Sequence, residues 1–156
     1  MAPSVAAELV DMTIDPQRIA AVFEEITKQH DFTLVEGAGG LLVPLTGRYT
    51  FADLAHNLHL PLLVVVGSKL GALNHALLTL SCAQARSLPV IGYILNHPTA
   101  SSDLATQTNA RTLAYLADAP CLGVLPFLSL SGDIECDRTL LSDVFSAAVD
   151  LARVLR

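Results

Sequence analysis

The fold of this chain is decided by the segment Pro61-Leu62-Leu63-Val64-Val65-Val66-Gly67-Ser68-Lys69-Leu70-Gly71. Its first six residues are continuously apolar, which is typical of a central parallel strand buried on both faces. Gly67 ends the run, and the residues that follow predict a long helix over residues 70–86. A strand followed directly by a helix of this length indicates a βαβ unit.

The same alternation continues toward both ends of the chain. Further strands are predicted at residues 32–36, 89–95 and 121–125. Further helices are predicted from Asp15-Pro16 to about residue 30, from Thr50 through residue 58, at residues 103–117 and at residues 140–155. Strands alternating with helices of ten or more residues require right-handed crossovers. The sequence therefore predicts an α/β fold with a mostly parallel sheet and flanking helices.

Composition indicates one ordered domain and excludes several functions. Hydrophobic residues make up 52% of the 156 residues and charged residues 15%, and we find no repeat or linker, so residues 1–156 are expected to form a single domain. A net charge of −6, with only Lys28 and Lys69 as lysines and no tryptophan, argues against nucleic-acid binding. The apolar runs are too short to span a membrane.

The cysteines and the first residues favour a cytoplasmic protein. Cys82, Cys121 and Cys136 are odd in number and form no C-x-x-C pair, so neither a disulfide framework nor a zinc site is predicted. Free thiols are typical of a reducing cytosol. The start of the chain has no basic and then apolar signal pattern, so export is not expected.

Polar residues at the ends of the predicted strands are the candidate functional residues, because ligands of open α/β sheets gather at the carboxyl edge. Glu36 ends one strand and opens Glu36-Gly37-Ala38-Gly39-Gly40, where a carboxylate beside glycines suits Mg²⁺ and phosphate. A solvent-facing acid above a glycine turn is an equally open interpretation. A dinucleotide fingerprint is set aside, because Leu42 stands where its third glycine is needed.

The turn at residues 67–74 and Asn96 each have a functional and an ordinary interpretation. The turn at residues 67–74 opens a helix, so its N–H groups could bind an anion or serve local hydrogen bonds through Ser68 or Asn74. Lys69 is not a phosphate-loop lysine, because the pattern G-x-x-x-x-G-K-S/T needs glycines where Leu63 and Ser68 stand. Asn96 could read a purine edge or shape a turn. The acidic residues 133–137 are expected to form a solvated loop.

Two long motifs in register resemble the dethiobiotin synthetase family. Residues 35–45 match its V-E-G-A-G-G-x-x-x-P-L signature, and residues 66–76 resemble its second signature. Residues 50–54, Asn96 and the segment around Ala2-Pro3 are similar to other parts of the family, and the likeness fades after about Pro126. The resemblance implies a three-layer α/β/α fold of the P-loop NTPase type.

The resemblance also implies an activity and a set of site residues. In that family, ATP drives the joining of CO2 to 7,8-diaminopelargonate: a carbamate takes the γ-phosphate, and the neighbouring amine then displaces phosphate to close the urea ring. Glu36 would bind Mg²⁺. The ATP site would comprise Glu36, Gly37, Ala38, Gly39, Asn96, His97, Leu125, Pro126 and Phe127, and the diamine site would comprise Gly39, Gly71, Ala72, Leu73 and Asn74.

The chain also departs from the family pattern. The family's phosphate-binding loop, G-T-D-T-x-x-G-K-T, has no counterpart here, so the domain is expected to be amino-terminally incomplete and inactive alone. We expect a homodimer, or pairing with a polypeptide that carries that loop. Two alternatives stay open: a non-catalytic dimer that binds a small carboxylate, and a cobyrinate-type amidoligase.

Overall fold

The computed structural model describes residues 1–100 and 103–155 and divides the chain into two compact units. The first comprises Met1–Pro61 and Arg86–Leu88, and the second comprises Leu62–Ala85 and Pro89–Arg156. Each unit is described by itself. That the whole chain forms one domain stays a prediction.

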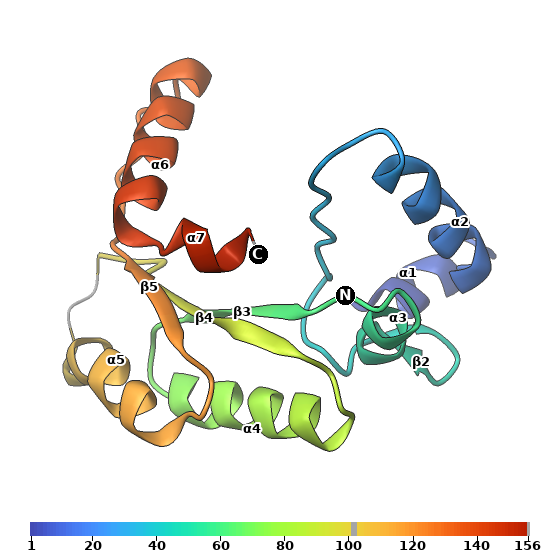
Figure 1. Cartoon of the computed structure of the whole chain (residues 1–156), viewed down its shortest axis with the longest axis horizontal. Helices are drawn as coiled ribbons and strands as arrows, with labels where there is room; N and C mark the ends of the chain where they lie inside the picture. Colours follow the sequence, from blue (N-terminus) through green and yellow to red (C-terminus); the bar gives the residue numbers. More distant parts are fainter. Residues whose placement is uncertain (101–102, 156) are drawn as a thin grey trace. The chain divides into compact units, whose positions relative to one another are not determined.

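The second unit is built on a parallel sheet of three strands (Figure 1). The strands are β3 (Leu62–Gly67), β4 (Val90–Asn96) and β5 (Cys121–Leu125), in the order β3-β4-β5. The helices α4 (Ala72–Ala85) and α5 (Leu104–Leu116) connect them. The prediction of a parallel α/β sheet with flanking helices is confirmed, because each strand returns through a helical crossover.

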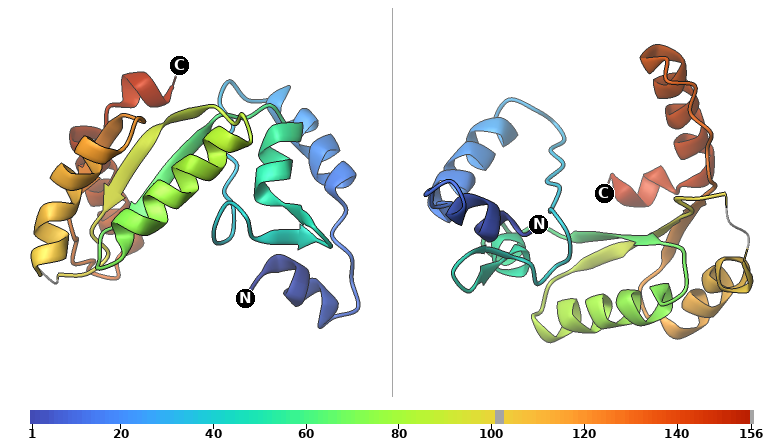
Figure 2. Two further views of the ribbon diagram at one scale, coloured as in Figure 1. Left: turned by 90° about the horizontal axis from the view of Figure 1, so that it is seen from below. Right: turned by 180° about the vertical axis from the view of Figure 1, so that it is seen from behind.

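Both faces of this sheet are covered by helices, which makes three layers (Figure 2). On one face Tyr93 and Leu95 pack with Ala76 of α4 and Leu113 of α5. On the other face the buried side chains of Ile94 and Leu122 are covered by α6 (Ile134–Ala148) and α7 (Leu151–Val154). Successive residues of β4 thus serve opposite cores, which explains why its sequence is continuously apolar.

The first unit holds shorter elements. They are α1 (Pro3–Glu8), α2 (Pro16–Thr27), β1 (Pro44–Thr46), β2 (Tyr49–Thr50) and α3 (Phe51–Asn57), with β1 and β2 paired antiparallel. The carboxylate of Asp15 accepts a hydrogen bond from the N–H of Gln17 and caps α2, as the Asp15-Pro16 pair predicts. The helix α1 and the short β1–β2 hairpin were not predicted.

The prediction of a strand at residues 32–36 is wrong. Residues 33–37 have no regular secondary structure, and Leu34 and Val35 are exposed. A β-rich run becomes a strand only when a neighbouring strand accepts and donates its backbone hydrogen bonds. No ladder joins these residues to any other part of residues 1–100 and 103–155.

The predicted helix at residues 140–155 and the acidic loop before it also need correction. The helix begins earlier, because the Asp133 carboxylate accepts a hydrogen bond from the N–H of Cys136 (2.8 Å) and caps α6, so residues 134–137 form its first turn. It ends at Ala148, where Val149 forms an antiparallel bridge with Gly123 of β5. A Cβ atom on Gly123 would lie 2.3 Å from the Ala148 carbonyl oxygen, so glycine permits this approach.

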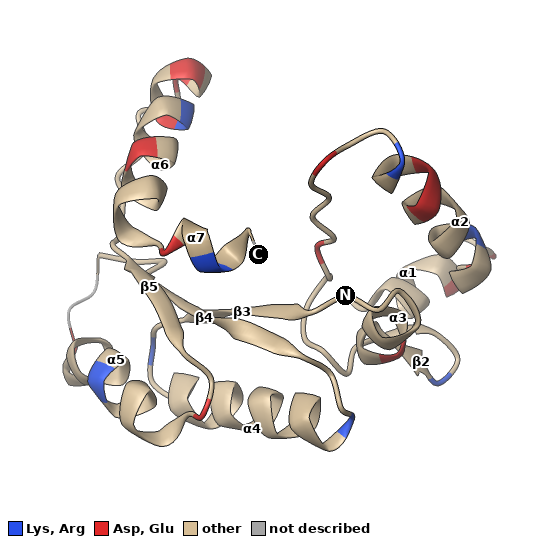
Figure 3. Cartoon of the chain, viewed as in Figure 1, with Lys and Arg blue, Asp and Glu red and all other residues tan. Residues whose placement is uncertain are grey.

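Charged side chains are absent from the three strands of the sheet and from α4 (Figure 3). The segments Leu62–Gly67, Ala72–Ala85, Val90–Asn96 and Cys121–Leu125 contain no lysine, arginine, aspartate or glutamate. Within residues 1–100 and 103–155, no helix combines the length and the apolar character needed to cross a bilayer. Cys82, Cys121 and Cys136 are free thiols.

Candidate functional site

The carboxyl ends of the three strands are joined by backbone hydrogen bonds. The N–H of Ser68, directly after β3, donates to the carbonyl of Asn96 at the end of β4 (2.7 Å). The N–H of His97 in turn donates to the carbonyl of Leu125 at the end of β5 (3.0 Å). The strand-end residues that the sequence singled out in this unit therefore lie side by side on one sheet edge.

A pocket of about 480 Å³ opens at this edge between the strand ends and α6. Its polar side chains come from Asn96, His97, Ser142 and Ser146, and most of its remaining lining is apolar. All five residues that the family resemblance implies for the nucleotide in this unit line it: Asn96, His97, Leu125, Pro126 and Phe127. An apolar cleft with a few polar groups is typical of a small-ligand site.

The α6 residues of this pocket were missed from the sequence. Leu141, Val144 and Phe145 line it, although the sequence predicted only that they belong to a helix and not that they line a site. Their spacing of three and four residues places them on one helix face, which was the available signal. The periodicity does not predict that this helix face points toward the strand ends, because that depends on where α6 packs.

The turn between β3 and α4 presents free backbone donors. Gly71 has a φ of +88°, in the left-handed region that favours glycine, and α4 begins at the next residue. Among the described residues, no acceptor takes a hydrogen bond from the N–H groups of Leu73 or Asn74, which lie in the first turn of this 14-residue helix. With the helix dipole, such donors favour an anion.

Side-chain hydrogen bonds from Asn109, on α5, hold this turn at Ser68 and Lys69. The Asn109 amide nitrogen, on α5, donates to Ser68 Oγ (3.2 Å) and to the carbonyl oxygen of Lys69 (3.1 Å). The same Lys69 carbonyl accepts the N–H of Ala72 (3.1 Å), which closes the turn. Asn109 could not be predicted from the sequence, because 41 residues separate it from Ser68 and only the packing of α5 brings the two side chains together.

The glycine segment after Glu36 belongs to the first unit. Glu36 is exposed, and Gly39 has a φ of +94° with an added Cβ atom only 3.1 Å from Val43 Cγ2, so this position requires glycine. The Val43 N–H donates to the Gly40 carbonyl (2.9 Å) and closes the turn. The hypothesis that this segment shares one cleft with Asn96 and with residues 71–74 stays a prediction.

The glycine segment is fixed to the start of α3. The N–H of Ala52 donates to the carbonyl of Leu41 (2.9 Å), and the N–H of Phe51 donates to that of Val43 (3.2 Å). These bonds satisfy first-turn donors of α3 and hold the loop's carboxyl end on the helix. The Phe51 ring also lies 3.3 Å from the position of a Cβ on Gly37, so this glycine allows close packing.

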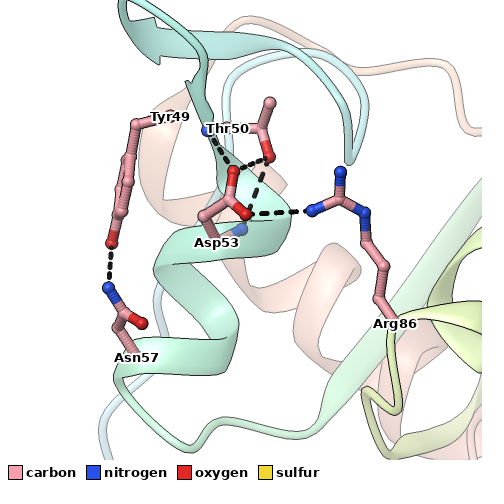
Figure 4. A network of polar contacts seen from close by, with 5 residues as sticks. All are labelled: Tyr49, Thr50, Asp53, Asn57 and Arg86. Carbon is pink, nitrogen blue, oxygen red and sulfur yellow. Dashed lines mark hydrogen bonds and ion pairs between the residues drawn. The ribbon is translucent and has the colours of Figure 1, made fainter.

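A polar network fixes α3 itself (Figure 4). Asp53 Oδ2 accepts hydrogen bonds from the N–H and the hydroxyl of Thr50 (2.7 and 2.6 Å), and Oδ1 accepts one from Arg86 Nη1 (2.9 Å). The Thr50 hydroxyl and backbone bonds, aided by the Arg86 charge, lower the pKa of the Asp53 carboxyl below its usual value. This is a capping box, and its role is structural.

Glu36 is the candidate metal ligand, and we ask whether one protein carboxylate suffices for a metal ion that phosphates and water also bind. Residues 1–100 and 103–155 contain no cluster of three or more histidine, cysteine, aspartate or glutamate side chains that could hold a metal ion. Mg²⁺ in nucleotide enzymes is commonly held by one or two carboxylates together with phosphates and water. A single exposed carboxylate beside a glycine turn is compatible with that arrangement.

The chain is similar in sequence to known proteins. A family model described as an AAA domain matches residues 1–134, so the chain belongs to that family. The proteins that it is similar to include ATP-dependent dethiobiotin synthetases. Those of Thermodesulfovibrio yellowstonii and Aromatoleum aromaticum are 39% and 44% identical to it, and each match covers 83% of this chain and 57% of the relative. The synthetase of Cellvibrio japonicus is 39% identical over 99% of this chain and 64% of its own length.

These matches confirm the resemblance read from the two signatures. The chain is a dethiobiotin synthetase-like protein that spans about three-fifths of the length of these relatives. The matched part includes the glycine segment, the turn before α4 and the strand ends that line the pocket.

Proposed function

We propose that this chain serves a dethiobiotin synthetase-type ligase of biotin biosynthesis, for which it holds the nucleotide base and the carboxylate of the diamine substrate. The overall reaction joins CO2 to 7,8-diaminopelargonate with ATP as the phosphoryl donor. The observation that carries the proposal is the pocket at the strand ends, lined by every second-unit residue implied for the nucleotide.

The pocket has the chemistry to hold a purine. The Asn96 side chain offers one amide donor and one acceptor, which can pair with a purine edge. Phe127 and Leu125 supply apolar contact for the ring faces. The base would anchor ATP at the sheet edge and leave its phosphates free to extend toward other groups.

The turn before α4 would take the substrate's carboxylate. The free N–H groups of Leu73 and Asn74 provide neutral donors at the positive end of a helix. Binding by backbone donors orients the substrate without bringing a second full charge near the reacting amines. Gly39, at the glycine turn of the first unit, would approach the diamine or phosphate.

Glu36 would hold Mg²⁺, and Gly37 to Gly39 would lie near phosphate. When bound, the metal neutralises charge on the phosphate oxygens during phosphoryl transfer. The Glu36 carboxylate would supply a ligand oxygen to the metal. We also propose a cytoplasmic location and self-association, or pairing with a polypeptide that carries a phosphate-binding loop.

Nucleotide binding to the 156-residue chain tests the base pocket. We expect adenosine and ATP to bind by calorimetry, and Asn96→Ala to weaken adenosine binding about tenfold, because each hydrogen-bonded base edge contributes about 1–3 kcal/mol. Gln84→Ala, at an exposed position of α4, is the matched control and should bind like the wild type. Equal binding by Asn96→Ala would contradict the assignment.

A coupled assay separates the ligase from a non-catalytic carboxylate binder. ATP hydrolysis is measured with diaminopelargonate and bicarbonate, for the chain alone and after addition of a polypeptide that carries the phosphate-binding loop. Hydrolysis that depends on the diamine supports the ligase. Diamine binding without any nucleotide binding would instead favour the non-catalytic alternative.

A further inference from the structure

Two buried polar side chains of the second unit meet at the turn before α4. Ser68 and Asn109 are only 1% and 3% exposed, and the Asn109 amide donates a hydrogen bond to the Ser68 hydroxyl (3.2 Å). Burial of an amide or a hydroxyl costs free energy unless it is hydrogen-bonded. A buried polar pair that links α5 to the turn before α4 therefore needs a reason beyond packing.

The pair fixes a short segment that would otherwise be held by few bonds. Ser68 is anchored to the sheet by its N–H bond to Asn96, and Asn109 adds one bond to the Ser68 hydroxyl and one to the Lys69 carbonyl. Two residues later Gly71 takes its left-handed conformation, and the free donors of Leu73 and Asn74 follow. Any rotation of the Lys69 peptide would therefore move those donors.

The helix that carries Asn109 is itself well anchored. The Asp103 carboxylate accepts the N–H of Thr106 (2.7 Å) and caps α5, and Leu113, one turn beyond Asn109, is buried against the sheet. Asn109 thus projects from an anchored helix onto a turn that lies between Gly67 and Gly71, two residues with few backbone restrictions of their own. This is the arrangement expected of a group that preorganises a binding turn.

We propose that Asn109 is a positioning residue for substrate: it holds the Ser68–Lys69 turn so that the free N–H groups of Leu73 and Asn74 bind the substrate's carboxylate. The inference rests on the proposed function, since it concerns the same carboxylate site. Asn109 does not touch the substrate and acts through the Lys69 carbonyl and the Ser68 hydroxyl.

The test compares two diamines that differ only in the carboxylate. Asn109→Leu keeps the side-chain volume and removes the donor. We expect it to weaken binding of 7,8-diaminopelargonate about tenfold, as loss of about 1.4 kcal/mol would do. Binding of the same diamine lacking its carboxylate should not change. Ser68→Ala, which removes one acceptor only, should have a smaller effect in the same direction.

A second readout needs no ligand. Hydrogen exchange at the Ser68 and Ala72 amides, whose N–H groups donate to the carbonyls of Asn96 and Lys69, should be faster in Asn109→Leu than in the wild type. Thr108→Val is the matched control and should leave exchange and binding unchanged, because the Thr108 hydroxyl donates within α5, to the carbonyls of Leu104 and Ala105.

The outcomes separate the inference from the proposed function. Unchanged exchange, or equal weakening of both diamines in Asn109→Leu, overturns the positioning role and leaves the proposed function standing. If the wild-type chain does not distinguish the two diamines, the carboxylate site itself fails, and both proposals fall. Selective weakening with faster exchange supports the positioning role.

Discussion

Tyr93 shows how a single residue is set by its place in the sheet. It lies in the central strand β4 and is fully buried, yet its hydroxyl has no hydrogen-bond partner among the described residues. Burial, and to a lesser degree the neighbouring Cys121 thiol, raises the pKa of Tyr93 to about 12. The ring supplies core volume, while the hydroxyl costs desolvation without a compensating bond.

Replacement of this hydroxyl should stabilise the protein. We expect Tyr93→Phe to raise the free energy of unfolding by about 1 kcal/mol, measured by urea unfolding followed by circular dichroism. Tyr115→Phe, at a position that is 87% exposed, should change nothing. A Tyr93→Phe variant less stable than the wild type would show that the hydroxyl has a partner.

The difference in the free energy of unfolding between Tyr93→Phe and the wild type should depend on pH. The folded pKa lies above the usual 10.0, so the neutral form is favoured in the folded state. As the pH rises from 10 toward 12, the Tyr93 hydroxyl ionises in the unfolded chain but stays neutral in the folded protein, so the free energy of unfolding of the wild type falls over that interval. Tyr93→Phe should therefore gain relative to the wild type over that interval.

At the scale of the element, α3 depends on its amino-terminal box. Thr50 and Asp53 bond reciprocally, and Arg86 adds an ion pair whose side chains are partly exposed. We expect Asp53→Asn to cost about 1 kcal/mol at neutral pH, the size of a capping interaction. Thermal unfolding of this variant is compared with that of Asp31→Asn, an exposed acid of the same unit, which should behave like the wild type.

Acid should remove this difference. The folded pKa of Asp53 lies below its usual 3.8, so its contribution is present above about pH 4 and disappears as the pH falls through the folded pKa. The unfolding temperatures of wild type and Asp53→Asn should converge below pH 4. A difference that persists there would mean that the bonds to Thr50 do not require the ionised carboxylate.

At the scale of the whole molecule, β3 has no strand partner on one edge within residues 1–100 and 103–155, and the face that α6 and α7 cover over β4 and β5 is partly open at β3. It is the outer strand in the order β3-β4-β5, and its Val65 side chain is 63% exposed on the face opposite Val66. An exposed apolar edge is a surface on which another strand or chain can add.

This surface predicts association. Static light scattering of the 156-residue chain should show a mass above that of a monomer, which rises with concentration, and Val65→Lys should lower it, because a lysine opposes burial of the edge. Val22→Lys, on an exposed position of α2, is the control and should leave the mass unchanged. A clean monomer at high concentration would contradict self-association.

Local sequence patterns determined several of the helices and strands of this protein, and its family. Each of these patterns involves residues only a few positions apart. The apolar run before Gly67 predicted β3, and the caps Asp15 and Thr50 with the helical periodicity predicted α2 and α3, which are all present. The two signatures likewise gave the family, because their residues are contiguous in the chain.

Only the tertiary structure decided which distant groups meet. Residues 32–36 have strand propensity but no ladder, Val149 leaves a helix to bridge Gly123, and Asn109 reaches Ser68 across 41 residues. The physical reason is common to all three: a backbone ladder or a buried hydrogen bond needs a partner, and its position depends on how helices and strands pack. Secondary-structure propensity is encoded in the local sequence, whereas the hydrogen-bonding partners of a residue are set by the folded chain.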